Sequence, residues 1–185
     1  MSTPVQSPAG LAGSVVLDTE GASVPLASLV GGRPLLLVFL RHYGCLFAKQ
    51  QADELVRHHA ELVAAGAEVV AIGNGTAEEA KTFAEEQALP FRLLTDPTGD
   101  SYCALSLKRG LRTALSPAVV ARAVRATASG FRQTRSAGDP LQQGGVIAFD
   151  AEGREIYRYV SETAGDHPQF GEVLVSLRRA SPVTR

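Results

Sequence analysis

Several features typical of secreted and membrane proteins are missing from this chain of 185 residues. Its two cysteines, Cys45 and Cys103, are too few for a disulfide scaffold, and too few for a four-ligand zinc site without help from the four histidines. The longest purely apolar run, residues 35–40, is far shorter than the roughly 20 residues that cross a bilayer. The N-terminus has neither the basic start nor the apolar stretch of a secretory signal. We therefore expect a cytoplasmic protein without a membrane partner, in which a cysteine is either buried or reactive.

Acidic residues are also missing from residues 101–138, although the chain as a whole has a net charge of -1. A local basic segment in a mildly acidic protein favours a small or local anionic partner over duplex nucleic acid, which requires a whole basic face. The alternative is an ordinary solvated helix face. We expect no nucleic-acid partner. The basic residues of the segment are Lys108, Arg109, Arg112, Arg122, Arg125, Arg132 and Arg135.

Hydrophobic residues make up 45% of the chain and charged residues 20%, which is the composition of an ordinary globular domain. The Pro, Ser, Gly and Thr content of residues 1–13 predicts a flexible tail with little to bury. We expect a single domain over residues 14–185, with a basic helical insertion at about residues 111–138.

The hydrophobic periodicity predicts an α/β fold. Residues 35–40 are continuously apolar, which is typical of a strand buried on both faces. Helical and strand patterns alternate after them, which indicates βαβ units and a parallel sheet core. The expected sheet is mixed, with helices on both faces and an N-terminal hairpin. The expected strands are residues 14–18, 23–26, 35–40, 68–72, 91–95, 145–150 and 155–160, and the expected helices are 47–65, 77–87, 101–107, 117–127 and 170–179.

Cys45 lies in the connection between the buried strand and the helix that follows it. Open α/β sheets bind their ligands at this end of their strands. A thiol at a helix N-terminus meets unpaired backbone N–H groups and the positive end of the helix dipole, both of which favour the thiolate. Arg41 and His42 add positive charge nearby. The alternative is a small apolar cysteine that only fills the junction of strand and helix.

Four short strings stand out along the sequence. They are Phe39-Leu40-Arg41-His42-x-Gly44-Cys45, Asp96-Pro97 with Tyr102 and Leu107-Lys108-Arg109-Gly110, Gly138-Asp139-Pro140-x-Gln142-Gln143-Gly144-Gly145, and Gly165-Asp166-His167. In this order they resemble the peroxiredoxin-like antioxidant proteins of the alkyl hydroperoxide reductase and thiol-specific antioxidant superfamily. The resemblance runs from about residue 14 to 179, and it implies the thioredoxin fold and a peroxide-reducing oxidoreductase without a cofactor or metal.

The sequence departs from this family in three places. Ordinary peroxiredoxins have a Thr or Ser three residues before the peroxidatic cysteine, with a Pro four residues before that, whereas His42 and Val38 stand here. Many relatives have a Cys-x-x-Cys pair, but Ala48 takes the second position, which excludes a dithiol mechanism within the helix turn. Residues 143–145 occupy the stretch in which thioredoxins usually have a proline.

The resemblance and the required chemistry together assign candidate roles. Cys45 is the nucleophile, and Arg41 and Arg109 are the candidates for stabilising the oxygen that leaves the O–O bond. His42, which could add positive charge near Cys45, is a further catalytic candidate. Cys103 could reduce the resulting sulfenic acid, or its side chain could only pack against the apolar residues around it. Further candidates are Asp166, which could fix the tautomer of His167, and the substrate-binding residues Tyr43, Gly44, Phe47, Gln143, Gly144 and Gly145, whose glycines would let a substrate approach the backbone.

Three functions follow as hypotheses. The first is a thiol-dependent peroxide reductase with one nucleophilic cysteine, an amphipathic organic peroxide as substrate and an external thiol as reductant. The second is an enzyme of a specialised biosynthetic pathway that reduces an endoperoxide or uses Cys45 as a covalent nucleophile without redox turnover. The third is a redox-inert module that binds an anion or a partner at the helix N-terminus. A homodimer is an open alternative for each of them.

Overall fold

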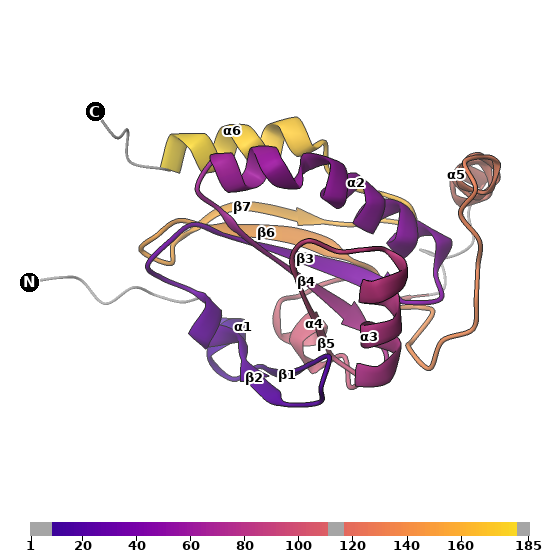
Figure 1. Cartoon of the computed structure of the whole chain (residues 1–185), viewed down its shortest axis with the longest axis horizontal. Helices are drawn as coiled ribbons and strands as arrows, with labels where there is room; N and C mark the ends of the chain where they lie inside the picture. The colour runs from indigo at the N-terminus through magenta and orange to yellow at the C-terminus, as the bar shows by residue number, and fades with distance from the viewer. Residues whose placement is uncertain (1–8, 111–116, 181–185) are drawn as a thin grey trace, which may run out of the picture.

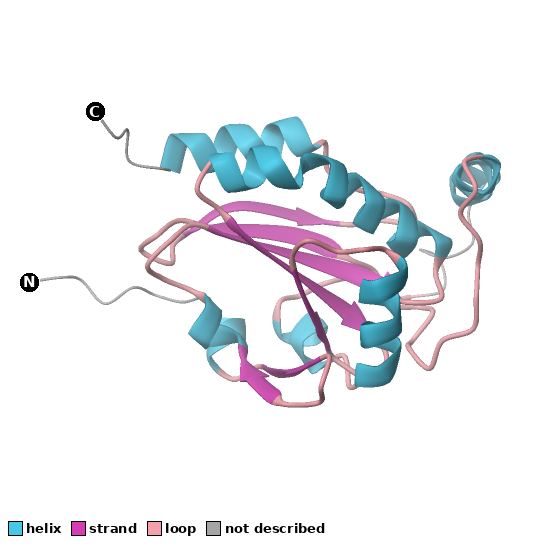
Figure 2. Ribbon diagram, in the orientation of Figure 1, coloured by secondary structure: helices cyan, strands magenta, loops and turns pink. Residues whose placement is uncertain are grey.

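The computed structural model describes residues 9–110 and 117–180. Within these ranges seven strands form one mixed sheet in the order β2-β1-β5-β4-β3-β6-β7, with helices on both faces (Figures 1 and 2). The three central strands β3, β4 and β5 are parallel, and the other pairs are antiparallel. The strands are β1 Val15–Asp18, β2 Ser23–Pro25, β3 Leu35–His42, β4 Glu68–Asn74, β5 Arg92–Thr95, β6 Gly145–Phe149 and β7 Glu155–Val160. The expected α/β class, mixed sheet and N-terminal hairpin are confirmed.

Helices α2 and α6 lie side by side over one face of the sheet, and α1 and α4 lie on the opposite side (Figure 1). A capping box in which Thr76 and Glu79 exchange hydrogen bonds begins α3. The helices are α1 Ala9–Ala12, the 3-10 helix η1 Leu26–Leu29, α2 Leu46–Ala64, α3 Ala77–Glu86, α4 Asp100–Ala104, α5 Pro117–Ala128 and α6 Phe170–Ala180. None of the helices in the described ranges is long and apolar enough to cross a membrane.

Strand β3 is the centre of the fold because all eight of its residues are buried. Its side chains alternate between the two faces, so Leu36, Val38 and Leu40 join the core beneath α2 and α6. The others, Leu35, Leu37 and Phe39, join the core beneath α1 and α4. Two hydrophobic cores therefore share this strand, one on each face of the sheet.

The sequence-based bounds of β3 and of the N-terminal tail need correction. The strand continues to His42 with an irregular register against β4 after Phe39, so Arg41 and His42 belong to the strand and not to a loop. The expected flexible tail over residues 1–13 is wrong for its last part, because Ala9–Ala12 form a helix whose Leu11 is fully buried. A single leucine in a stretch of small residues gives no periodic signal, although it fills the core beneath η1 and α4. Residues 1–8 lie outside the described ranges.

Helix α5 belongs to the expected basic insertion and lies at the right-hand end of the molecule in Figure 1, where β3 and β4 end. It contacts α2 and buries Val119 and Ala126, whereas Val120 and Val124 are exposed. Residues 111–116 of the insertion, with Arg112, lie outside the described ranges.

Candidate active site

Cys45 is the N-cap residue of α2, at the position that the sequence predicts. Its backbone N–H donates to the carbonyl oxygen of His42 at 2.9 Å, and its own carbonyl accepts from Ala48 and Lys49 in the first turn of the helix. Its side chain is buried with Tyr43 and Phe47 in the core beneath α2. Cys45 thus immediately precedes the first turn of a long helix.

Arg41 is buried near this point without an anionic partner. Its Nη2 donates to the carbonyl oxygen of Pro140 at 2.6 Å and its Nη1 to Oε1 of Gln143 at 3.3 Å, while its Nε has no partner. No carboxylate of the described residues forms an ion pair with it. Burying a guanidinium that contacts only neutral groups destabilises the fold, because its charge loses hydration without gaining an opposite charge. The arrangement therefore favours an anion at this end of β3.

Two neutral histidines border the same region. Burial and the charge of Arg41 lower the pKa of His42 to about 4, against the opposing effect of Glu79 and Asp139. Burial also lowers the pKa of His167 to about 4. Nδ1 of His42 and both ring nitrogens of His167 are buried without a hydrogen-bond partner. Such orphaned nitrogens usually indicate a ligand, a water molecule or a catalytic role.

The expectation that Asp166 fixes the tautomer of His167 is wrong. The Asp166 carboxylate accepts hydrogen bonds from the hydroxyl of Tyr159 at 2.7 Å and from the backbone N–H of Glu162 at 2.8 Å. Both hydrogen bonds lie within the loop between β7 and α6. They occupy the Asp166 carboxylate, which forms no hydrogen bond with the His167 ring. The strength of these two partners could not be read from the Gly165-Asp166-His167 string alone.

Residues 131–139, which we call the covering segment, cross the N-terminus of α2. Gln133 accepts the N–H of Leu46 with its Oε1 at 3.1 Å, and the N–H of Thr134 donates to the carbonyl oxygen of Gly44 at 2.8 Å. Farther on, the N–H of Ala137 donates to Oε1 of Glu79. Gln133 thereby caps the helix that carries Cys45, a role for which the sequence offers no signal, since the contact depends on how a distant loop is placed.

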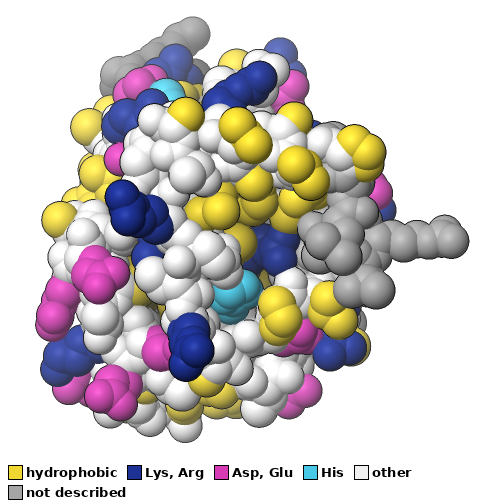
Figure 3. Space-filling view, turned by 90° about the vertical axis from the view of Figure 1, so that its right-hand side faces the viewer, with side chains coloured by type: hydrophobic (Ala, Val, Ile, Leu, Met, Phe, Trp, Pro, Cys, Tyr) yellow, Lys and Arg dark blue, Asp and Glu magenta, His cyan; other side chains and the backbone are white. Residues whose placement is uncertain are grey.

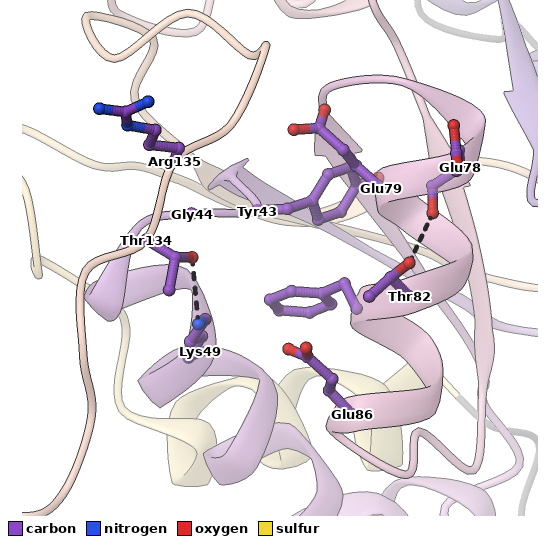
Figure 4. A pocket seen from close by; sticks show the side chains of 10 residues that line it. Tyr43, Gly44, Lys49, Glu78, Glu79, Thr82, Glu86, Thr134 and Arg135 are labelled. Atoms are coloured by element: carbon purple, nitrogen blue, oxygen red, sulfur yellow. Dashed lines mark hydrogen bonds between the residues drawn. The ribbon is translucent and has the colours of Figure 1, made fainter.

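A cavity of about 430 Å³ lies between α2 and α3, beside the residue that precedes Cys45 (Figure 4). Thr134 and Arg135 of the covering segment form one wall, and Glu79 and Glu86 of α3 lie across from them. The expected substrate-binding residues Gly44 and Tyr43 both line this cavity. The Tyr43 hydroxyl, however, donates to the carbonyl oxygen of Leu94 at 3.1 Å, and burial raises its pKa. The Tyr43 side chain therefore packs in the core, and its hydroxyl is bonded within the protein.

Arg109 and Cys103 lie together, away from Cys45. Arg109 is largely exposed and pairs with Asp139 through its Nε at 2.5 Å. Cys103 is exposed on α4, and both residues line a separate cavity of about 280 Å³. Because α4 packs on the opposite face of the sheet from α2, the two free thiols are separated by the sheet. The sequence could not show on which face Arg109 lies, and the structure does not bring it to the Cys45 site.

The expected substrate-binding stretch 143–145 is filled by the protein itself. Gln143 is fully buried and holds Arg41, Gly144 lies directly against the carbonyl of Phe39, and Gly145 is the first residue of β6. The close backbone approach that glycine permits here is made by a neighbouring strand, which corrects the expectation of a substrate at this point.

The surface around the ends of β3 and β4 is suited to an amphipathic ligand. Hydrophobic side chains gather on this face around a hollow in which basic side chains and a histidine are visible (Figure 3). Phe47 of α2 and Val119 of α5 belong to the core on this side, and Arg122 of α5 donates to Oγ1 of Thr163 at 2.7 Å. Within the described ranges, no group of three or more His, Cys, Asp or Glu residues is placed to hold a metal ion.

Comparison with known proteins decides the family. Residues 54–163 match the AhpC/TSA antioxidant enzyme family. The chain belongs to this family. It is 29% identical to the thioredoxin-like protein AAED1, chloroplastic, of Arabidopsis thaliana over 170 residues, covering 86% of this chain and 68% of that protein. It is also 29% identical to the prostamide/prostaglandin F synthase of Salmo salar over 172 residues, covering 89% and 84%.

A solved structure shares the fold of this chain. Peroxidoxin BcpB from Mycobacterium tuberculosis superimposes with a TM-score of 0.66 over 91% of this chain and 94% of its own, at 18% identity. This likeness confirms the thioredoxin-like fold that the sequence strings imply. The AhpC/TSA protein is thus a peroxiredoxin-like oxidoreductase, as the resemblance predicts.

Proposed function

We propose that this AhpC/TSA protein reduces an organic peroxide with Cys45 as its single nucleophile and an external thiol as its reductant. The observation that supports this most strongly is the buried Arg41, which lies at the end of the strand leading to Cys45 and has no anionic partner. A thiolate or a developing alkoxide supplies the missing negative charge. The family's redox chemistry makes a peroxide the natural source of that alkoxide.

The reaction proceeds in three steps. The Cys45 sulfur attacks one peroxide oxygen, the S–O bond forms, the O–O bond breaks, and the electron pair leaves on the distal oxygen, which is protonated to an alcohol. The sulfenic acid then reacts with one external thiol to give a mixed disulfide and water. A second external thiol releases Cys45 and carries away the disulfide.

The position of the second thiol supports a single-cysteine mechanism. Cys103 is on α4, across the sheet from Cys45, and a disulfide requires Cα atoms within about 7 Å. The native fold therefore keeps Cys103 from resolving the sulfenic acid. A reducing compartment such as the cytoplasm would supply the external thiol.

An organic peroxide suits this site better than hydrogen peroxide does. His42 replaces the hydroxyl that peroxiredoxins use to hold the small substrate, and apolar side chains surround the hollow at the ends of β3 and β4. The basic insertion at about residues 111–138 supplies α5 and the covering segment to this region.

The experiment measures the second-order rate constant of Cys45 oxidation by cumene hydroperoxide and by hydrogen peroxide, with Cys45→Ser and Cys103→Ser as variants. We expect a higher rate constant for cumene hydroperoxide, no turnover in Cys45→Ser and normal turnover in Cys103→Ser. An equal or higher rate constant for hydrogen peroxide contradicts the preference, and turnover in Cys45→Ser contradicts the mechanism.

A cyclic endoperoxide is a second candidate substrate. The similarity to a prostamide/prostaglandin F synthase over 89% of the chain supports it. The attack on sulfur would be the same, but the leaving oxygen would stay on the same molecule as a hydroxyl group. Adding a stable bicyclic endoperoxide to the same assay, with product analysis, separates the two substrates.

A further inference from the structure

The loop between β7 and α6 is pressed against the first turn of the helix that carries Cys45. Gly165 has a φ of +72°, and a Cβ atom built there would lie only 2.7 Å from two ring carbons of Phe47. This close approach brings His167 beside α2, where the backbone of Phe47 comes near its ring. Arg122 fastens the loop from the other side by donating to Thr163 and to the carbonyl of Ala164.

His167 stands out because neither of its ring nitrogens has a hydrogen-bond partner, although both are buried. Among the described residues, the other buried side-chain atoms without a partner are Nε of Arg41 and Nδ1 of His42. Leaving such a group unsatisfied costs about 1–3 kcal/mol. The three residues that bear this cost converge on the end of β3 and the start of α2, the same place as the proposed nucleophile.

The charges around His167 keep its ring neutral. Burial and the positive charges of Arg122 and Arg41 lower its pKa, whereas Asp166 and the Phe47 backbone act in the opposite direction. The Asp166 carboxylate is already bound by Tyr159 and Glu162. A neutral imidazole has one donor nitrogen and one acceptor nitrogen, and here neither has a partner of good hydrogen-bond geometry, although the Phe47 backbone lies close to the ring.

We propose that His167 carries the proton from the Cys45 thiol to the oxygen that leaves the peroxide. As the S–O bond forms, the thiol proton passes to the acceptor nitrogen of the ring. The proton on the other ring nitrogen passes to the leaving oxygen as the O–O bond breaks. Cys45–SH and ROOH thus become Cys45–SOH and ROH, and His167 ends neutral in its other tautomer. This role rests on the proposed peroxidase function.

A proton carrier can be told apart from a structural residue by the basicity of the leaving oxygen. Cumene hydroperoxide releases an alkoxide, which is strongly basic and needs a proton, whereas peracetic acid releases acetate, which needs none. The experiment measures single-turnover oxidation of Cys45 by each oxidant, using quenching and mass spectrometry, in wild type, His167→Gln and the control His58→Gln. His58 is on the outer part of α2, where it stacks on Phe170.

We expect His167→Gln to lose about 10²- to 10⁴-fold in rate constant with cumene hydroperoxide, the usual contribution of general acid–base catalysis. With peracetic acid we expect a smaller loss, because acetate leaves without a proton and only the transfer from the Cys45 thiol is affected. His58→Gln should match wild type with both oxidants. Equal losses with both oxidants would overturn the role of His167 and leave the proposed function standing. A wild-type Cys45 that resists cumene hydroperoxide would overturn both proposals. The circular dichroism spectrum of His167→Gln, compared with that of wild type, shows whether the variant is folded.

Discussion

The backbone N–H of Thr134 donates to the carbonyl oxygen of Gly44, the residue immediately before Cys45, at 2.8 Å. Two segments far apart in sequence therefore meet directly over the proposed nucleophile. The covering segment can pass this closely only because Gly44 lacks a side chain, since an added Cβ would lie 2.9 Å from the carbonyl carbon of Thr134 and even nearer to its oxygen. The contact determines how the site is closed.

The first prediction concerns Gly44→Ala. The added methyl group should displace the covering segment and cost about 1–3 kcal/mol in the free energy of unfolding, as overpacking usually does. Urea denaturation measures this loss, and limited proteolysis near Thr134 should become faster. The control is Gly171→Ala in α6, where an added Cβ meets nothing within 4 Å. That variant should be as stable as wild type or slightly more stable, because alanine favours the helix. Equal stability of the two variants would contradict the tight crossing.

The second prediction concerns Arg41→Met. Removing a buried charge without an anionic partner should leave the free energy of unfolding unchanged or raise it. The same change should lower the rate constant of Cys45 oxidation by about 10²- to 10³-fold, because the group that stabilises the leaving oxygen is lost. Stability is measured by urea denaturation, and oxidation by mass spectrometry. The control Arg57→Met removes an exposed arginine that pairs with Asp53 on the same helix, and should change neither quantity appreciably. A marked loss of stability in Arg41→Met would show that its charge is compensated.

The third prediction concerns pH. Because the folded-state pKa values of His42 and His167 are lowered to about 4 from 6.5, the unfolded chain binds more protons than the folded chain between these values. The free energy of unfolding should therefore be fully retained above about pH 6.5 and fall as the pH drops toward 4. For His167 alone the loss is on the order of 3 kcal/mol, and His42 adds to it. Urea midpoints between pH 7.5 and 4.5 measure it. The double variant His42→Gln, His167→Gln should have a flatter profile, and an unchanged slope would contradict the assignment.

The fourth prediction concerns the two thiols. A stoichiometric pulse of cumene hydroperoxide should oxidise Cys45 without linking it to Cys103, because the sheet separates them. Peptide mapping under non-reducing conditions detects the product. Cys103→Ser should give the same yield of oxidised Cys45 as wild type. A linked Cys45–Cys103 peptide in high yield would mean that local unfolding brings the two residues together.

The sequence predicts the fold more fully than the site. Residues 35–40 are apolar without interruption, so the buried central strand and the location of Cys45 after it can be deduced from periodicity alone. The covering segment cannot, because Gln133 acts on Leu46 through a contact between distant parts of the chain. The sequence offers both Arg41 and Arg109 as candidates, and only the three-dimensional arrangement shows that Arg109 pairs with Asp139 whereas Arg41 lies in the buried strand that leads to Cys45. Short sequence strings predict which residues belong to the site. They do not predict hydrogen-bond partners, because Asp166 could bond to His167, Tyr159 or Glu162, and only the folded chain shows which of them it binds.

The sheet between Cys45 and Cys103 also governs how this protein would respond to oxidative stress. With no second thiol within reach in the native fold, the oxidised chain must wait for a thiol from solution, and more peroxide can arrive first and carry the sulfur on to the sulfinic acid. The fraction of chains permanently lost then depends on the ratio of peroxide to thiol in the surroundings. A population of such molecules keeps a lasting record of that ratio, which a self-resolving dithiol enzyme would erase after each turnover.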